Sequence, residues 1–326
     1  MKKPLVAILI AASLLLALVA LTLGPSGITV GETVHILLGQ GSTANKHYII
    51  WRLRLPRIIA SFLTGAILGF SGAIFQAALR NPMADPFILG VSSGASFGVA
   101  VALAVGLGAL VGFPIAALTG SVITTLVILA LSVRQKGATT TLILTGVAIN
   151  YILSAAMTLL MFMNKEQYQR ILYWSMGSFS TATWSEVTVI ALTMVVLIIP
   201  LSASHRSLDM LLLDESSGRA AGLSVGSVRL MVLLPASIAT AVCVSYFGVI
   251  GFIGLMAPHV SRLIVGPKHQ RLLAPSALFG GFLLLLSDTL ARLLLPSGEL
   301  PVGVITSLAG VPLFIYLLRR GRYRYG

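Results

Sequence analysis

The sequence is built around long, continuous runs of apolar residues, and these runs constrain the fold more than any other feature. The first, LVAILIAASLLLALVALTL, extends from Leu5 to Leu23 without a charged residue. A run of this length can cross a lipid bilayer as a helix. Because the runs are continuous rather than short and alternating, they favour helical spans over a β-barrel. The sequence therefore predicts an all-α integral membrane protein.

Charged residues are scarce along the whole chain. They make up 10% of its 326 residues, against about 25% in a typical soluble domain. At about 20 residues per span, the length allows roughly ten helices and leaves no room for a soluble catalytic domain. No low-complexity linker divides the chain, so we expect one transmembrane domain over residues 1–326. The predicted spans lie near residues 5–23, 58–79, 88–106, 113–133, 141–163, 186–203, 228–248, 252–265, 272–294 and 302–318.

The N-terminus, two lysines followed by an apolar run, also fits a signal peptide. No small-residue cleavage site follows before Gly24, so we predict an uncleaved first span. Lysine and arginine in short loops favour the cytoplasmic side. With both termini in the cytoplasm, 15 of these residues fall inside and 7 outside, which together are the 22 of the chain. We therefore expect a multi-pass protein of the cell (inner or plasma) membrane with cytoplasmic N- and C-termini.

Small residues recur at helical spacing in several of the apolar runs. In lipid, such positions let two helix backbones approach closely, so they predict tight helix packing. The single cysteine, Cys243, also lies within an apolar run, which predicts a buried and inert thiol. The small positions are Gly65, Gly69, Gly94, Gly98, Gly248, Gly251 and Gly254.

The sequence lacks the residues that an energy source or an active site would need. None of its nine acidic residues lies in the middle of a predicted span, whereas ion-coupled transporters usually place an ionisable group at membrane depth. It contains no phosphate-binding loop motif, and its five histidines are scattered, without metal-ligand spacing. We therefore expect no enzyme activity, no cofactor and no metal site, and an energy source on another protein.

The stretch RNPMADPFILG, from Arg80 to Gly90, interrupts the helical pattern with two prolines and three polar or charged residues. Pro82 and Pro86 prevent a continuous helix because each lacks an amide donor and crowds the preceding turn. At membrane depth, the freed backbone groups must be covered by protein or face water. An ordinary turn with Asp85 as the cap of the next helix is one interpretation, and a functional element is the other.

The longest polar break between spans is Ser204–Arg229, SHRSLDMLLLDESSGRAAGLSVGSVR. It predicts two short helices with a turn, over about residues 206–226. An amphipathic helix here could lie in the lipid headgroups. It could equally dock in a groove on a soluble partner, and composition leaves both open.

Three long segments, with this surface helix between them, resemble the permease subunits of type II ATP-binding-cassette importers for ferric siderophores, haem and vitamin B12. The resemblance implies a ten-helix fold and a homodimer or close heterodimer with a pathway along its axis. It also implies two copies of a cytoplasmic ATP-binding subunit and an extracytoplasmic substrate-binding protein. An iron–siderophore complex is the expected cargo, with haem or cobalamin as the alternative; an ATP-independent channel is the rival class. The segments are RLRLPRIIASFLTGAILGFSGAIFQAALRNPMADPFILGVSSGASFG (52–98), GFIGLMAPHVSRLIVG (251–266) and SDTLARLLLPSGELPVGVITSLAGVPLFIYLL (287–318).

The resemblance also implies a docking site for the binding protein. Arg54, Arg57 and Arg292 match outer arginines that such permeases use to hold acidic residues of that protein. Exposed cations of this kind raise the encounter rate and fix the register. Arg292 follows Asp288 by four residues, so a local ion pair is its alternative interpretation.

Two further sets of residues match functional positions of the family. The cytoplasmic gate is expected at Asn81 and Met83 in the proline-containing break, and at Thr139 and Thr140 at the start of the span near residues 141–163. Threonine at this place is also an ordinary helix cap. A mostly apolar wall is expected around the pathway. Contact with the ATP-binding subunit is expected along the surface helix, at Leu208, Leu211, Leu212, Asp214, Glu215, Arg219, Ala220, Ala221 and Gly222.

Overall fold

The structure is a computed structural model, and it describes residues 3–24, 27–40, 43–134, 139–165, 168–212, 224–295 and 298–320. Over these residues all the secondary-structure elements are helices, joined by turns and loops. The helices are α1 (Lys3–Thr22), α2 (Val30–Leu37), α3 (Ala44–Tyr48), α4 (Leu55–Ala78), α5 (Val91–Ala104), α6 (Gly108–Arg134), α7 (Thr139–Met163), α8 (Tyr168–Ser175), α9 (Trp184–Thr193), α10 (Ile199–Leu201), α11 (His205–Leu211), α13 (Val225–Phe247), α14 (Ile253–Val265), α15 (His269–Leu293) and α16 (Val302–Arg320). Short segments of π-helix, η1 (Ile49–Arg54) and η4 (Met194–Ile198), and of 3₁₀-helix, η2 (Pro86–Leu89) and η5 (Ser202–Ser204), connect some of them.

The apolar runs of the sequence correspond to the long helices. Within the described ranges, seven helical stretches are long and apolar enough to cross a membrane, and α5, α14 and α16 are shorter apolar helices. Each of the ten predicted spans therefore has a helical counterpart, although the count of ten membrane crossings is approximate. The short helices α2, α3 and α8 were not predicted.

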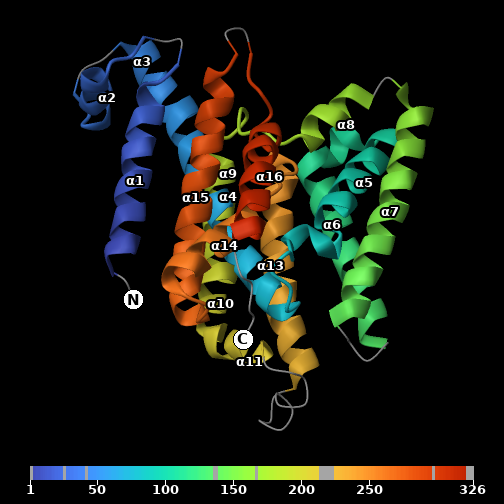
Figure 1. Cartoon of the computed structure of the whole chain (residues 1–326). Coiled ribbons are helices and arrows are strands. Elements are labelled where there is room, and N and C mark those ends of the chain that lie inside the picture. The colour runs from blue at the N-terminus through green and yellow to red at the C-terminus, as the bar shows by residue number, and fades with distance from the viewer. Residues whose placement is uncertain are drawn as a thin grey trace.

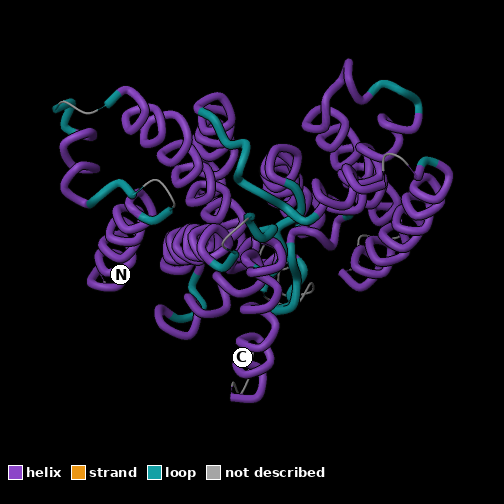
Figure 2. Tube along the Cα trace, turned by 90° about the horizontal axis from the view of Figure 1, so that it is seen from above, coloured by secondary structure: helices purple, strands orange, loops and turns teal. Residues whose placement is uncertain are grey.

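The helices stand roughly side by side, in two groups joined by α13 (Figure 1). One group contains α4, α14 and α15, with α1 on its outer side. The other contains α5, α6 and α7, and α13 packs against α4, α5 and α6. Figure 2 shows the same groups from above. We call the end that carries α2, α3 and α8 the α2 end, and the opposite end the α11 end.

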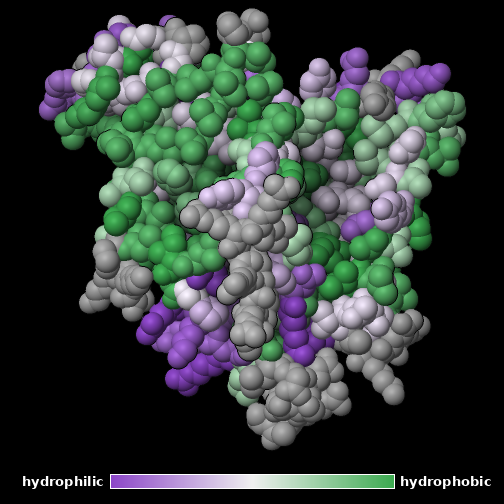
Figure 3. Space-filling view, viewed as in Figure 1, coloured by the Kyte–Doolittle hydropathy of each residue, from purple (hydrophilic) through white to green (hydrophobic). Residues whose placement is uncertain are grey.

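The surface is consistent with a membrane environment. On the face seen in Figure 3, apolar residues cover most of the middle of the molecule, and hydrophilic residues gather towards the two ends. A chain whose side walls meet lipid needs such a belt, because lipid cannot solvate polar side chains. The apolar belt and the spans together place the helices across the bilayer.

The centre of the fold is α4, of which 20 of 24 residues are buried. Its small residues face the backbones of two other helices. A Cβ added at Gly65 would lie 2.4 Å from the Gly280 carbonyl oxygen of α15, and one at Gly72 would lie 1.8 Å from the Gly254 carbonyl oxygen of α14. These contacts confirm the predicted tight packing.

The second group of helices is joined in the same way. A Cβ at Gly94 of α5 would lie 2.6 Å from the Gly120 carbonyl oxygen of α6, and one at Gly98 would lie 2.3 Å from that of Ala116. Gly251, in contrast, has no neighbour within 4 Å of an added Cβ, so its prediction as a packing residue is wrong. Cys243 is a buried free thiol, as predicted.

The proline-containing break between α4 and α5 is a compact turn. Arg80 adopts a positive φ of 46°, and the side chain of Asn81 accepts a hydrogen bond from the amide of Met83 at 2.9 Å. Asp85 accepts one from the amide of Phe87 at 2.6 Å and so caps η2. Gly90, with φ of 77°, then redirects the chain into α5. The predicted cap is confirmed, although it belongs to the short η2 rather than to α5.

Candidate functional site

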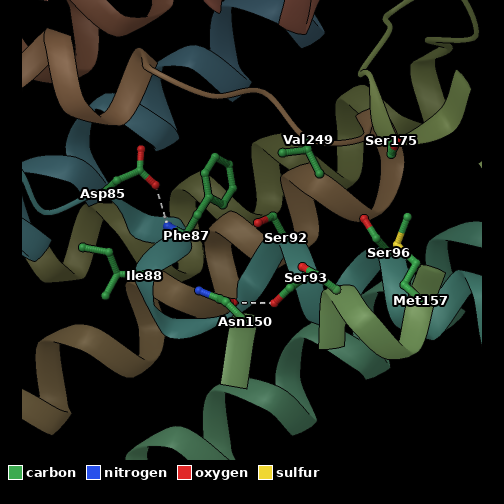
Figure 4. Close-up of a pocket in the computed structure, with 11 residues that line it drawn as sticks. Asp85, Phe87, Ile88, Ser92, Ser93, Ser96, Asn150, Met157, Ser175 and Val249 are labelled. Carbon is green, nitrogen blue, oxygen red and sulfur yellow. Dashed lines mark hydrogen bonds between the residues drawn. The ribbon is translucent and has the colours of Figure 1, made fainter. Parts of the chain in front are cut away.

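A cavity of about 570 Å³ lies between η2, α5 and α7, and polar side chains from α5, α7 and the cap of η2 line it. Figure 4 shows serines along one side of α5, with Asn150 of α7 beside them and Asp85 and Phe87 on η2. Ser175, the last residue of α8, and Val249, which follows α13, also line the cavity. Its polar lining residues are Asp85, Ser92, Ser93, Ser96, Asn150, Ser154 and Ser175.

Helical spacing explains why these polar groups face one space. Ser92 and Ser96 are four residues apart on α5, and Asn150 and Ser154 are four residues apart on α7, so each pair lies on one face of its helix. The register between the two helices is fixed by a hydrogen bond from the Ser93 hydroxyl to the Asn150 side-chain oxygen. The two helix faces thus form one wall.

Several polar groups of this wall have no protein partner. Among the described residues, the hydroxyls of Ser92, Ser96 and Ser154 form no hydrogen bond, and Asn150 uses only its oxygen. Asp85 is half-buried, and only one of its carboxylate oxygens is engaged, by the amide of Phe87. Burial raises the pKa of Asp85 to about 6, although that hydrogen bond acts in the opposite direction. These groups can therefore bind water or a solute.

Seven of the eleven residues that line the cavity are polar, although apolar atoms still supply most of its exposed surface, so the mostly apolar pathway wall expected from the sequence stays a prediction. The serines of α5 follow the turn at Gly90 in the string VSSGASFG, and Asn150 lies within the apolar run of α7. A polar amide inside a span was a usable signal, because such groups seek partners in lipid. The prediction from acidic residues at membrane depth does not include this signal.

The helix α7 is unusual because most of its surface is uncovered. Only 11% of this span is buried within the chain, against 83% for the span that includes α4. Large apolar side chains at Tyr151, Leu159 and Phe162 are more than half exposed. A span this bare faces lipid, a second copy of the chain, or both.

The arginines predicted to dock a binding protein lie at the α2 end, and two of them are ion-paired within the chain. Arg57 donates from Nε to both carboxylate oxygens of Asp288, at 3.1 and 3.0 Å, and from Nη2 to Oδ1 at 2.8 Å. Its Nη1 lies 2.8 Å from an oxygen of Glu299. The Arg292 Nε lies 3.9 Å from Asp288, so the local i,i+4 pair is present.

Burial distinguishes these arginines from their neighbour Arg52. Arg54 and Arg57 are 7% and 8% exposed, and Arg54 donates a hydrogen bond to the Leu21 carbonyl oxygen. Arg292 is half-buried, and Arg52 is exposed at the same end. In the isolated chain, the three predicted arginines therefore contribute to internal structure, and docking by them remains a prediction.

The residues predicted to form the gate lie on two separate elements. Asn81 and Met83 are in the break between α4 and α5, where Asn81 is half-buried and Met83 is 43% exposed. Thr139 and Thr140 form the first turn of α7, and Thr140 is exposed. All four side chains are at least partly accessible, as a gate requires, but their role as a gate remains a prediction.

Only the first part of the predicted coupling segment lies within the described residues. There, Leu208 and Leu211 of α11 are fully buried against the chain's own helices. Arg80 donates to the Leu211 carbonyl oxygen at 2.6 Å, and Asp209 accepts from the His269 amide at 3.0 Å. The helix α11 is thus attached to the bundle, and Leu212 beside it is half-buried. The positions outside the described residues are Asp214, Glu215, Arg219, Ala220, Ala221 and Gly222.

The search for metal ligands over the described part of the chain finds no group of three or more histidine, cysteine, aspartate or glutamate side chains that could hold an ion. The cavity between α5 and α7 contains a single carboxylate. The arrangement can accept and donate hydrogen bonds. It is suited to binding a polar solute.

The bundle of apolar spans, with a solute-sized cavity on a bare helix, is that of a membrane permease. Comparison with known proteins is more specific. Residues 9–320 match the FecCD transport family, and the chain belongs to this family. It is a permease subunit of a type II ATP-binding-cassette importer, as the resemblance implied. Such permeases dimerise and work with an ATPase and a substrate-binding protein, and hydrolysis takes place on the separate ATPase subunit.

Individual relatives show the same relationship over nearly the full length. The chain is 38% identical to the cobalamin import system permease protein BtuC of Halobacterium salinarum, over 90% of this chain and 78% of the relative. It is 38% identical to the vitamin B12 import system permease protein BtuC of Salmonella paratyphi A, over 86% of each. Among solved structures, an inward-facing ABC transporter assigned to the metal-chelate type has a TM-score of 0.87 at 29% identity, and the match covers 98% of this chain and 100% of that one.

Proposed function

We propose that this permease imports a cobalamin-like metal chelate, driven by ATP hydrolysis on its partner subunit. The observation that carries the proposal is the 38% identity to cobalamin permeases, sustained over 86–90% of the chain. At this level of similarity the helices that form the pathway wall are shared, and the cavity on α5 and α7 supplies a wall with hydrogen-bonding groups. A bulky solute rich in amides would find partners there.

An iron–siderophore complex, the cargo expected from the sequence, is the second candidate. It is supported by the 0.87 TM-score to an ABC transporter assigned to the metal-chelate type. Haem belongs to the same class of cargo. We rank cobalamin first because two of the relatives with the highest similarity carry that substrate in their names.

The assembly that we propose contains two copies of this chain, or this chain and a close paralogue, with two ATP-binding subunits and one binding protein. The exposed face of α7 is the support within the structure, because a second copy would cover the large apolar side chains at Tyr151, Leu159 and Phe162. The cavity would then open towards the space between the copies. We place both termini, and hence the α11 end, in the cytoplasm, because more lysine and arginine residues then lie inside.

Within this assembly, the α2 end would receive the binding protein and the α11 end the ATPase. Arg57 carries an exchangeable partner, since the Glu299 side chain is 42% exposed. An acidic residue of the binding protein could replace Glu299 without leaving the guanidinium unpaired. Asn81, Met83, Thr139 and Thr140 would narrow the pathway near the α11 end, and the segment of residues 206–226 would transmit the movement of the ATPase.

The experiment that tests the proposal is uptake by a strain that lacks this gene, with and without a plasmid copy. Labelled cyanocobalamin, a ferric hydroxamate, a ferric catecholate and haem are offered separately. We expect cyanocobalamin uptake to fall in the deletion strain, to return with the plasmid, and to stop when cellular ATP is depleted. Unchanged cyanocobalamin uptake would exclude cobalamin, and uptake that continues without ATP would exclude an ATP-driven importer.

A further inference from the structure

The cavity between η2, α5 and α7 has a chemical character that restricts its ligand. We propose that it is a weak cargo-binding site in the pathway wall, one that accepts neutral or cationic, amide- or hydroxyl-rich solutes and excludes polyanionic ones. The proposal rests on the import function above and specifies the class of cargo. It assigns to the permease a share of the cargo selection, in addition to that of the binding protein.

Charge is the first observation. Among the described residues that line the cavity, Asp85 is the one ionisable group, and there is no lysine, arginine or histidine. A solute with several negative charges would enter a space with a carboxylate and no compensating cation. Because such a charge must lose much of its hydration in a half-enclosed cavity, it needs a paired cation that this wall does not supply.

The hydrogen-bonding groups are the second observation. The hydroxyls of Ser92, Ser96 and Ser154 can each donate and accept, and the Asn150 amide nitrogen can donate twice while its oxygen is held by Ser93. These groups have no protein partner among the described residues. They match the carbonyl and amide groups of a neutral polar solute, which would otherwise lose its hydrogen bonds with water.

The geometry of the wall is the third observation. The polar groups come from two helices and a turn, and the hydrogen bond between Ser93 and Asn150 fixes their spacing. The volume of about 570 Å³ lies within the range of small-molecule sites, roughly 300–1,000 Å³, so the cavity can receive one side of a larger chelate. Neutral hydroxyls and a single amide bind weakly compared with ion pairs, which allows the solute to be released.

The test has two parts. Binding is measured by equilibrium dialysis on the permease–ATPase complex in lipid nanodiscs, without the binding protein, so that the binding protein's own specificity does not contribute. Transport is measured on the complete complex of permease, ATPase and binding protein in proteoliposomes. The probes are cyanocobalamin, which is neutral and rich in amides, and a ferric tris-catecholate, which carries three negative charges. We expect the wild-type complex to bind cyanocobalamin at least about tenfold more tightly than the ferric tris-catecholate, because the cavity offers a carboxylate and no cation to a negatively charged solute.

Two substitutions examine the wall itself. Asn150→Leu removes the amide donors and should weaken cyanocobalamin binding roughly threefold to tenfold, the usual effect of one lost hydrogen bond. Ser154→Lys adds a cation and should reduce the preference for the neutral probe by about tenfold. Thr158→Lys is the matched control, because Thr158 is an exposed hydroxyl residue one turn further along α7 and does not line the cavity. Each variant is checked for an unchanged elution volume in size-exclusion chromatography, and the control Thr158→Lys also for unchanged basal ATP hydrolysis.

The outcomes distinguish a failure of the proposed binding site from a failure of the proposed import function. Equal binding of the two probes by the wild type, no detectable cyanocobalamin binding at millimolar concentration, or the same effect of Ser154→Lys and Thr158→Lys would each overturn the proposed site. ATP-dependent uptake in proteoliposomes with the binding protein would persist in those cases. If the wild-type complex transports neither probe nor any other chelate, the import function fails instead.

Discussion

The buried ion cluster at the α2 end leads to a quantitative prediction. The side chain of Asp288 is 1% exposed and that of Arg57 is 9% exposed, and three hydrogen bonds of 2.8–3.1 Å join them. Two unit charges about 4 Å apart attract by about 4 kcal/mol at an effective dielectric constant of 20, and by about 1 kcal/mol in water. Asp288→Asn removes one charge and leaves a buried guanidinium with Glu299 alone. We expect a loss of about 3–5 kcal/mol in the free energy of unfolding.

The assay is thermal unfolding of the purified permease in detergent micelles. For a chain of this size, a loss of that magnitude lowers the melting temperature by roughly 6–10 °C. Glu32→Gln is the control, because it breaks an exposed ion pair with Lys46, 2.6 Å long, while glutamine can keep the cap of α2. We expect no resolvable change from it.

A double substitution separates charge pairing from packing. Arg57→Met with Asp288→Leu removes both charges, so no buried ion is left without a partner, and the melting temperature should return close to that of the wild type. The reasoning is refuted if Asp288→Asn melts with the wild type. It is also refuted if the double variant melts no higher than Asp288→Asn.

Three further predictions follow from other parts of the structure. Gly72→Ala places a Cβ 1.8 Å from the Gly254 carbonyl oxygen, so it should lower the free energy of unfolding of the detergent-purified protein by about 1–3 kcal/mol. An unchanged melting temperature would show that α4 and α14 can move apart without cost. Glu299→Gln removes the carboxylate that pairs with Arg57 within the chain. It should therefore strengthen docking of the binding protein severalfold at low salt, as measured by surface plasmon resonance. Weaker docking would contradict the replacement of Glu299 by an acidic residue of the binding protein. Because burial raises the folded-state pKa of Asp85 to about 6, wild-type stability should fall as pH rises from about 4 to 6. Asp85→Asn should not show that fall. If the melting temperatures of the two proteins change with pH in the same way, Asp85 is not the cause of the fall.

The spans could be predicted because a bilayer imposes a simple rule on composition and length. The helices α2 and α8 could not be predicted by that rule, since they are short and lie outside the apolar runs. For α2 a signal existed: Thr29 and Glu32 form a capping box in the structure, and their threonine-x-x-glutamate spacing is visible in the sequence. For α8 we find no comparable signal.

The candidate site was less accessible to sequence reasoning. The pair of Asp288 and Arg292 could be anticipated from its spacing, but Arg57 and Asp288 are 231 residues apart along the chain, and nothing local joins them. The polar cavity depends on the register between α5 and α7, and this register cannot be predicted from a single sequence. Single serines in an apolar helix are also ordinary at helix contacts, so their convergence on one space becomes visible only when both helices are placed.

The glycine contacts described above have a consequence for movement. At Gly65 and Gly72, α4 meets α15 and α14 backbone to backbone, and α5 meets α6 in the same way at Gly94 and Gly98. Surfaces in such close contact cannot separate or shift without losing that contact, so we expect each group of helices to move as a rigid body. Displacement is then concentrated in the short turn between α4 and α5, and in the interface that α13 shares with both. The part of the cavity wall that α5 and α7 carry then keeps its shape during transport, whereas Asp85 and Phe87, which lie in the turn, change their position relative to it.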